Sequence, residues 1–256
     1  MGCMKYLLFL IVCLSVHAKE MKLLVLNIAA DGAPYYVELQ KIWRTYMNYD
    51  PEHVESYFLK YDPNLDVPYK IEDSVIWFRG EETYIPGIAD KTVLAMEVLK
   101  PRLKEFDFVL RTNLSSFVIF PRLLEFLKTL PKTGLYYACE NKILRKDEPY
   151  IPFGSGAALI FSPDVVEMMV RDKHKLIGKD LIDDVLFGWF FHEKKVPLRI
   201  ATRMDILDLF TWIAWKDRIP ENHYHFRLKN PDHRRMTDEL MMHKAMVKMF
   251  YGTKGS

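Results

Sequence analysis

Adjacent carboxylates stand at the start of an apolar helical segment, where they could act as acid or base. The segment 180–189 reads Asp-Leu-Ile-Asp-Asp-Val-Leu-Phe-Gly-Trp. Burying carboxylates beside such a segment costs free energy, so a chemical use would account for them. Asp184, or Asp183 as the second choice, could be the general base that deprotonates a hydroxyl nucleophile. The alternative is that these charges complement the helix macrodipole, a role that suits Asp180 best.

A second candidate is a strand that passes directly into polar residues. The apolar run 106–110 predicts a buried strand, and Arg-Thr-Asn-Leu-Ser follows at 111–115. At the end of a parallel strand, the side chains of Arg111, Thr112, Asn113 and Ser115 would face a ligand. An ordinary turn, in which Asn and Ser make local hydrogen bonds, accounts for the pattern about as well.

Two glycines flank a serine at Gly154, Ser155 and Gly156. Glycines permit the backbone to approach a ligand closely. The segment lacks the preceding strand that a dinucleotide-binding or phosphate-binding loop requires. A tight turn entering the strand 157–161 is the alternative interpretation.

The fourth candidate is basic. His223, His225, Arg227 and Lys229 would share one face of a strand, because side chains two residues apart point the same way. That face could meet a diphosphate, and His225 is a candidate metal ligand. A solvated basic surface is the alternative.

The elements that must position these residues follow from the hydrophobic pattern. Strands and helices alternate, which predicts an α/β fold with a mainly parallel sheet flanked by helices. Ligands of such sheets lie beyond the carboxyl ends of the strands, where Asn27 and Arg79 also fall. Pro101 predicts a kink or break in its helix. The expected strands are 22–28, 54–59, 74–78, 106–110, 134–139, 157–161 and 198–202, and the expected helices are 33–46, 90–106, 121–130, 162–170, 180–192 and 237–250.

Length and composition bound the remaining possibilities. The 256 residues are half hydrophobic, which suits one domain over 21–256. The net charge of +2 gives no electrostatic case for binding nucleic acid.

The first 20 residues have the pattern of a signal peptide, in which an apolar run, 6–16, follows Lys5. A short membrane anchor is the alternative; either would place the protein in the secretory pathway. Cys139 is the one cysteine after this leader, so no disulfide can form within the remaining chain.

Taken in order, these segments resemble the β1,3-galactosyltransferase and fringe group, whose domain has the GT-A glycosyltransferase fold. The resemblance runs from about Lys22 to about Lys229. Segment 42–46 is similar to the family's segment after the first strand, and 90–92 to its Leu-Lys-Thr helix start. Segment 153–162 looks like Tyr-x-x-Gly-x-Gly-Tyr-x-x-Ser. Residues 183–188 resemble Glu-Asp-Val-x-x-Gly, the motif that carries the family's base, and Asp184 matches that base.

The resemblance implies a single GT-A-like (Rossmann-like) domain that transfers a sugar, with inversion, from a nucleotide-sugar donor to a hydroxyl acceptor such as a glycan. The donor would be UDP-linked. Gly154, Ser155 and Gly156 would border the acceptor. The donor would meet Asn27, Arg79, Lys91, Arg111, Thr112, Asn113, Ser115, Arg227 and Lys229.

One departure from the family is chemically important. Where the family has Asp-Asp-Asp, this chain has Asn113-Leu114-Ser115, so the hard oxygen ligands for Mn²⁺ or Mg²⁺ are missing. Three explanations stay open. Arg and Lys side chains could neutralise the leaving diphosphate without a metal. Other groups, such as His225 and Asp184, could hold the metal. Finally, the chain could be a non-catalytic relative that binds a nucleotide or a carbohydrate.

Overall fold

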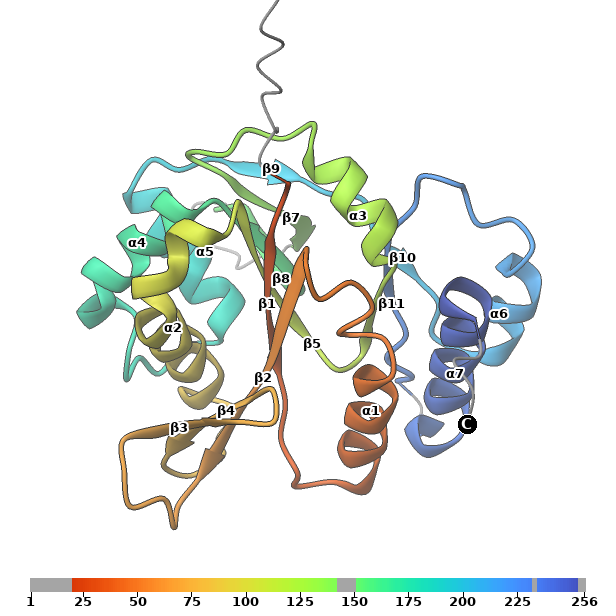
Figure 1. The fold of residues 1–256 in the computed structure, drawn as a ribbon, viewed down its shortest axis with the longest axis horizontal. Coiled ribbons are helices and arrows are strands. Elements are labelled where there is room, and N and C mark those ends of the chain that lie inside the picture. The colour runs from red at the N-terminus through yellow and green to blue at the C-terminus, as the bar shows by residue number, and fades with distance from the viewer. Residues whose placement is uncertain (1–19, 142–150, 232–233, 253–256) are drawn as a thin grey trace, which may run out of the picture.

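A computed structural model describes residues 20–141, 151–231 and 234–252. Within them, an eight-stranded sheet has the order β3-β4-β2-β1-β5-β8-β7-β9. Strands β4, β2, β1, β5, β7 and β9 run in one direction, and β3 and β8 run against them. A second sheet, β10-β11-β6, lies beside it. The carboxyl ends of the parallel strands therefore gather at one edge, the lower edge in Figure 1.

The elements follow the expected alternation closely. The strands are β1 Leu23–Ile28, β2 Val54–Asp62, β3 Tyr69–Glu72, β4 Val75–Arg79, β5 Phe108–Asn113, β6 Ser116–Val118, β7 Tyr136–Asn141, β8 Phe153–Phe161, β9 Leu198–Ile200, β10 Met204–Asp205 and β11 His225–Arg227. The helices are α1 Pro34–Arg44, α2 Gly87–Leu99, α3 Phe120–Leu127, α4 Pro163–Arg171, α5 Asp183–Glu193, α6 Leu209–Trp215 and α7 Asp238–Tyr251, with short 3-10 helices at Lys100–Glu105, Lys173–Lys175 and Arg234–Met236.

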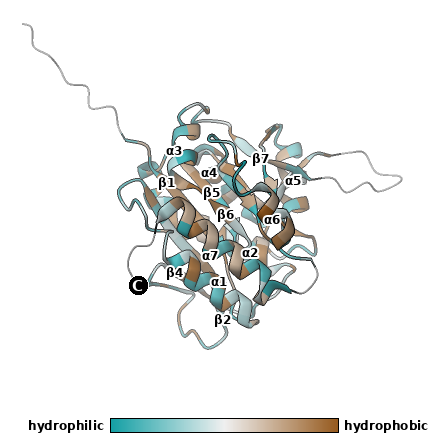
Figure 2. Cartoon of the chain, turned by 90° about the vertical axis from the view of Figure 1, so that its right-hand side faces the viewer, coloured by the Kyte–Doolittle hydropathy of each residue, from teal (hydrophilic) through white to brown (hydrophobic). Residues whose placement is uncertain are grey.

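Helices cover both faces of the large sheet. Helices α2, α4 and α5 pack on one face, and α1, α3, α6 and α7 lie toward the other (Figure 1). Side chains alternate along each strand. Leu24 and Leu26 therefore pack in the core under α2, α4 and α5, while Leu23 and Val25 pack in the core on the opposite face. Figure 2 shows the hydrophobic interior strands behind helices of mixed colouring. The α/β class with a mainly parallel sheet flanked by helices is confirmed, and this is the arrangement expected of a GT-A-like domain.

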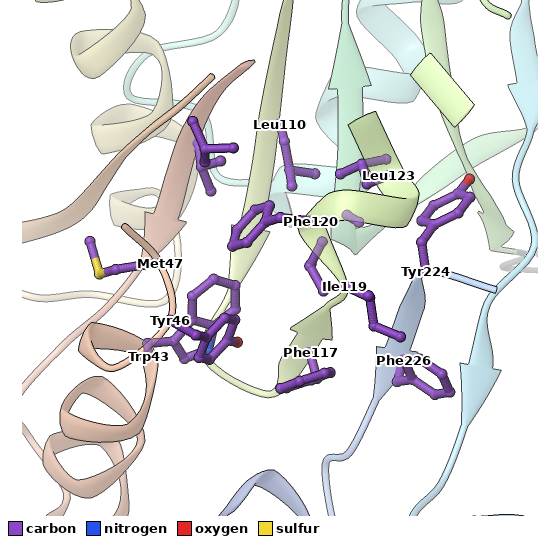
Figure 3. Packing of buried hydrophobic residues seen from close by; sticks show 14 of the residues in the cluster. Trp43, Tyr46, Met47, Leu110, Phe117, Ile119, Phe120, Leu123, Tyr224 and Phe226 are labelled. Carbon is purple, nitrogen blue, oxygen red and sulfur yellow. The ribbon is translucent and has the colours of Figure 1, made fainter. Parts of the chain in front are cut away.

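The aromatic core under α1 also fixes the turn after β5. The buried indole of Trp43 donates a hydrogen bond to the carbonyl of Leu114 at 3.1 Å. Tyr46 packs on Phe117 with ring centroids 5.1 Å apart, and Figure 3 shows these rings converging below Phe120. The polar turn 113–115 is therefore anchored by helix α1 as well as by its own strand.

One local expectation is confirmed, and two elements were not predicted. The helix breaks near Pro101 as expected: α2 ends at Leu99 and the chain continues as the 3-10 helix Lys100–Glu105, because Pro101 cannot supply an α-helical hydrogen bond. The hairpin β3–β4 was not predicted: its turn at Asp73 and Ser74 has positive φ angles of 50° and 59° without the usual glycine. Helix α6 was also missed. In the described part of the chain, no helix is long and apolar enough to span a bilayer. The proposed leader, 1–20, lies outside that part except for its last residue.

Candidate active site

The polar segment after β5 binds its neighbouring strand. Strand β5 extends through Asn113, so Arg111 and Thr112 belong to the strand itself. The Thr112 hydroxyl donates to the carbonyl of Ala157 at 2.7 Å, and the Asn113 amide donates to that of Gly156 at 3.3 Å. Asn113 Oδ1 accepts from the backbone N–H of Ser115 at 3.1 Å, as the turn interpretation predicts. Much of the hydrogen-bonding capacity of Thr112 and Asn113 therefore holds the sheet edge together.

Arg111 and Asp183 form a buried ion pair between β5 and α5. Their side chains are 3% and 9% exposed. The guanidinium donates one hydrogen bond to Asp183 and another to the carbonyl of Gly156. Because Asp183 Oδ2 already accepts from Arg111 in a buried contact, this carboxylate is less open to a substrate hydroxyl. The geometry favours a positioning role for Asp183 and does not favour its second-choice role as base.

Asp184 is the carboxylate that remains available. It lies in the first turn of α5, where the backbone N–H of Val185 donates to its Oδ1 at 2.9 Å. Burial and the negative charge of Asp183 raise its pKa, while Arg111 and the backbone N–H of Gly156 oppose the rise. A half-buried carboxylate with a raised pKa at the carboxyl edge of the sheet suits a general base.

The glycines lie inside β8, which corrects the expected turn before a strand. Because β8 runs against its neighbours, its first residues reach the carboxyl edge of β5. A Cβ on Gly156 would lie 2.7 Å from Arg111 Nη1 and 3.2 Å from Asp183 Oδ2. A Cβ on Gly154 would lie 2.5 Å from that of Ala138. Both glycines are thus required by side chains of the protein, whereas the Ser155 hydroxyl accepts from Arg203 at 2.7 Å.

The basic segment is only partly a strand. Strand β11 covers His225–Arg227, so His223 and Lys229 lie outside it, and the expected four-residue face is wrong. Arg227 is half-buried, and its guanidinium makes no hydrogen bond or ion pair with any described residue. Its register partner on β6 is Ser116, which places it beside the turn after β5. Lys229 is exposed.

His225 is poorly suited to hold a metal ion. Burial and the charges of Arg203 and Arg227 lower its pKa to about 3. Its Nε2 is buried without a hydrogen-bond partner in the described part of the chain. In those same residues no three His, Cys, Asp or Glu side chains come together as a ligand set. Neighbouring cations disfavour a further cation.

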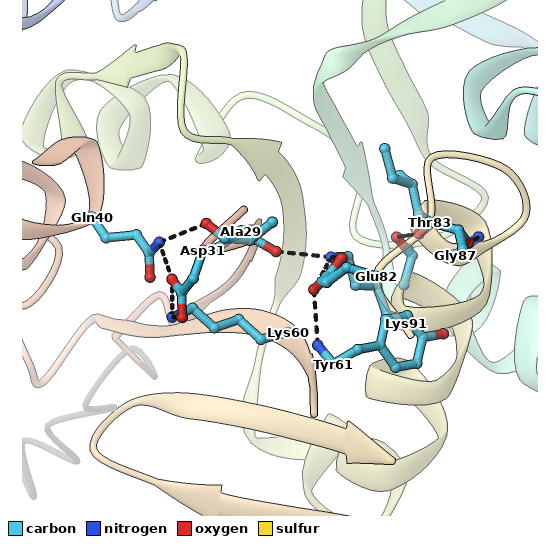
Figure 4. A network of polar contacts seen from close by, with 12 residues as sticks. Ala29, Asp31, Gln40, Lys60, Tyr61, Glu82, Thr83, Gly87 and Lys91 are labelled. Atoms are coloured by element: carbon cyan, nitrogen blue, oxygen red, sulfur yellow. Dashed lines mark hydrogen bonds and ion pairs between the residues drawn. The ribbon is translucent and has the colours of Figure 1, made fainter. Parts of the chain in front are cut away.

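Two ion pairs that the sequence did not predict lie near the ends of β1 and β2 (Figure 4). They join Lys60 to Asp31 and Lys91 to Glu82. Lys60 binds Asp31 at 2.6 Å, and Gln40 donates to the same carboxylate at 3.0 Å. The ammonium of Lys91 donates to Ala29 O at 2.8 Å and to both oxygens of Glu82 at 2.8 and 3.0 Å. All three Lys91 hydrogens are therefore used, and binding a donor would require it to release one partner.

Two further predicted donor residues differ in their surroundings. Asn27 is 1% exposed, and both polar atoms of its amide lack partners among the described residues. An unpaired buried amide costs roughly 1–3 kcal/mol, which marks this strand end as a place where a bound group or water would be stabilising. Arg79 is exposed at the end of β4. Donor binding by either residue stays a prediction.

The structure adds two arginines to the site. Arg203 is held by Asp205 at 2.5 Å and reaches Ser155, and Arg235 donates to the hydroxyl of Ser115 at 2.7 Å. Arg235 also lies 4.0 Å above the ring centroid of Tyr35. The sequence did not identify either arginine as a site residue. Arg203 follows the predicted strand 198–202 and Arg235 lies in a basic segment, and neither pattern indicates which side chain the arginine contacts.

Comparisons with known proteins give structural similarity without a sequence match. No family model matches the chain, and no curated protein sequence matches it. A crystal structure described as that of a glycosyltransferase involved in the glycosylation of the major capsid of PBCV-1 is similar over 87% of this chain and 99% of its own. The TM-score is 0.48 and the identity 6%. A likeness at this level carries no argument about the chemistry of the site.

Proposed function

We propose that the protein transfers a sugar from a nucleotide-sugar donor, UDP-linked, to a hydroxyl group of an acceptor, with inversion at the anomeric carbon. The observation that carries the proposal is Asp184, a half-buried carboxylate with a raised pKa at the carboxyl edge of the sheet. The resemblance of its sequence context to the fringe group's base motif agrees with this role.

The step is a single displacement. The acceptor hydroxyl gives its proton to Asp184 while its oxygen forms a bond to the anomeric carbon. The bond from that carbon to the diphosphate breaks, and its electron pair leaves with the nucleoside diphosphate. Attack opposite the leaving group inverts the configuration. Asp183 holds Arg111, and this pair fixes the start of α5 on which Asp184 lies.

Arginines would offset the charge of the leaving diphosphate. Arg227 is the strongest candidate, because it is half-buried and has no carboxylate partner in the described residues. Arg203 and Arg235 border the same region through Ser155 and Ser115. Guanidinium groups bind phosphate oxygens with paired, charge-assisted hydrogen bonds. Asn113 and Ser115 offer a divalent metal no carboxylate oxygen, and the proposed displacement uses no metal ion.

A donor-hydrolysis assay with and without EDTA tests this function. We expect the wild type to release UDP from at least one UDP-sugar, at a rate that EDTA leaves unchanged. Asp184→Asn should lose transfer by two orders of magnitude or more yet still bind UDP, since general acid–base catalysis contributes roughly 10²–10⁴-fold. The matched control is Asp180→Asn, an exposed aspartate near the same helix start. Retained turnover in Asp184→Asn would remove the base assignment.

A non-catalytic nucleotide- or carbohydrate-binding relative is the second candidate. The observation that favours it is that Lys91 and Arg111 are each already held by a carboxylate of the protein, Glu82 and Asp183 respectively. A thermal-shift screen against UDP, GDP and CMP sugars would show stabilisation in both cases. Binding without turnover of any donor would support the binding protein.

The first 20 residues are proposed as a signal peptide, with a short membrane anchor as the alternative. Either would deliver the domain to the ER or Golgi lumen or the cell exterior, where glycan acceptors occur. Mass spectrometry of the protein expressed in a secreting eukaryotic cell would identify the mature N-terminus. Cleavage near Ala18 is the expected result, and an intact N-terminus in the membrane fraction would favour the anchor.

A further inference from the structure

The segment between β4 and α2 crosses the carboxyl ends of β2 and β1. Glu82 accepts from the backbone N–H of Tyr61 at the end of β2, at 2.8 Å. Glu82 also binds Lys91, whose ammonium donates to the carbonyl of Ala29 just after β1. The segment is therefore fixed over the sheet edge by two different strands (Figure 4).

The same segment is fixed again where α2 begins. The Thr83 hydroxyl accepts from the backbone N–H of Gly87 at 3.1 Å, and a Cβ on Gly87 would lie 2.6 Å from that oxygen. Tyr84 lies between these two anchors, two residues from Glu82 and so within about 7 Å of it along the chain. Its backbone is constrained, yet the residue is 65% exposed.

Tyr84 lies at the same edge of the sheet as the proposed reaction centre, because its segment crosses the end of β1, the strand next to β5. Burial first, and then the negative charges of Asp183 and Asp184, raise the pKa of Tyr84, while Arg111 opposes the rise. These groups belong to α5 and β5, across the sheet edge from the strand that leads to Tyr84. Tyr36 on α1 also acts on it. The exposed residue Tyr84 therefore stands at the carboxyl edge of the sheet, within electrostatic reach of α5, β5 and α1.

We propose that Tyr84 is an aromatic platform on which a pyranose ring stacks at the transfer site. A pyranose presents one face of C–H groups and a rim of hydroxyls, so it can cover an aromatic face while its hydroxyls stay hydrogen-bonded. An exposed tyrosine ring is energetically unfavourable in water and becomes favourable when such a face covers it. The polar rim then lies near Asp184, the group that accepts a hydroxyl proton. This inference rests on the proposed function.

The pyranose could be the donor's transferred sugar or the acceptor's sugar, and the experiment separates the two sources. Calorimetry measures the affinities of the full chain for UDP, UDP-glucose and UDP-galactose, and for a panel of methyl glycosides. The variants are Tyr84→Ala, Tyr84→Phe and Tyr84→Trp. Tyr69→Ala is the matched control, because Tyr69 is 46% exposed on β3 at the outer edge of the sheet. Thermal melting of each variant reports folding.

We expect Tyr84→Ala to weaken sugar binding roughly ten-fold, about 1.4 kcal/mol, while leaving UDP binding unchanged. A loss confined to UDP-sugars identifies the donor ring, and a loss confined to glycosides identifies the acceptor ring. Tyr84→Phe and Tyr84→Trp should retain binding, because the contact uses the ring face.

Three results would overturn the platform. Equal weakening of UDP and UDP-sugars by Tyr84→Ala would show that the ring stacks on the base. A loss in Tyr84→Phe as large as in Tyr84→Ala would assign the effect to the hydroxyl. Finally, the wild-type protein could bind UDP-sugars no more tightly than UDP and bind none of the methyl glycosides. That result would show that the protein makes no contact with a pyranose ring. Failure of the proposed function can be told apart from failure of the platform. The first appears as absent turnover in the wild-type protein, whereas the second appears in the separate measurements of sugar binding.

Discussion

The buried pair of Arg111 and Asp183 gives the sharpest stability prediction. The perturbation is Asp183→Asn, which removes the negative charge and keeps the shape of the side chain. Arg111 is only 3% exposed, so water cannot replace the lost partner. Breaking such a pair from one side costs about 3–5 kcal/mol, because a buried charge is left uncompensated. For a chain of this size the melting temperature should fall by roughly 6 to 20 °C.

The assay is urea unfolding followed by far-ultraviolet circular dichroism, with the linear extrapolation applied to each variant. The double variant Arg111→Met with Asp183→Leu should recover most of the loss, since it removes both charges together. Glu125→Gln is the control, because it breaks an ion pair whose side chains are 55% and 71% exposed. Its unfolding midpoint should match wild type. An Asp183→Asn midpoint equal to that of this control would refute the reasoning, as would additive losses in the double variant.

Two further predictions concern the same edge. Gly156→Ala should lose stability and turnover together, because its Cβ would lie 2.7 Å from Arg111 Nη1. Gly32→Ala is the control, because a Cβ at Gly32 would meet open space. An unchanged melting temperature for Gly156→Ala would contradict this close packing. Asp184→Asn should be more stable than wild type at pH 7 but not near pH 3, as read from urea unfolding at each pH. The folded pKa of Asp184 is raised, so wild type loses stability as the pH climbs from the unfolded value of about 3.9 through the folded one, and asparagine avoids that loss. A stability difference that is independent of pH would refute this.

Local sequence was sufficient for most elements of the fold. The continuous apolar run that became β1 and the helical spacing of α1 depend on which side chains leave water, and that is encoded within a few residues. The missed elements are those where local signals are weak. Strand β3 is exposed along its whole length, so its pattern has no buried face, and β11 is only three residues long.

The site was predicted less completely, because residue type does not specify partners. Asp183 and Asp184 are adjacent in sequence and equivalent in pattern. The fold turns Asp183 onto Arg111, 72 residues away, and leaves Asp184 near the glycines of β8. Similarly, Lys91 was expected to meet a donor, and only the folded chain shows that Glu82 and Ala29 occupy its ammonium.

The amino-acid sequence by itself determined the α/β class, the polar strand ends and the absence of an acidic triad at 113–115. These depend on composition and on periodicities of two and 3.6 residues, which need no long-range contact. The tertiary structure decided which charges are neutralised, which carboxylate has a raised pKa and which aromatic residue stays exposed at the carboxyl edge. Those properties depend on burial and on distances between residues far apart in sequence, and both are set only when strands, helices and the loops between them pack together.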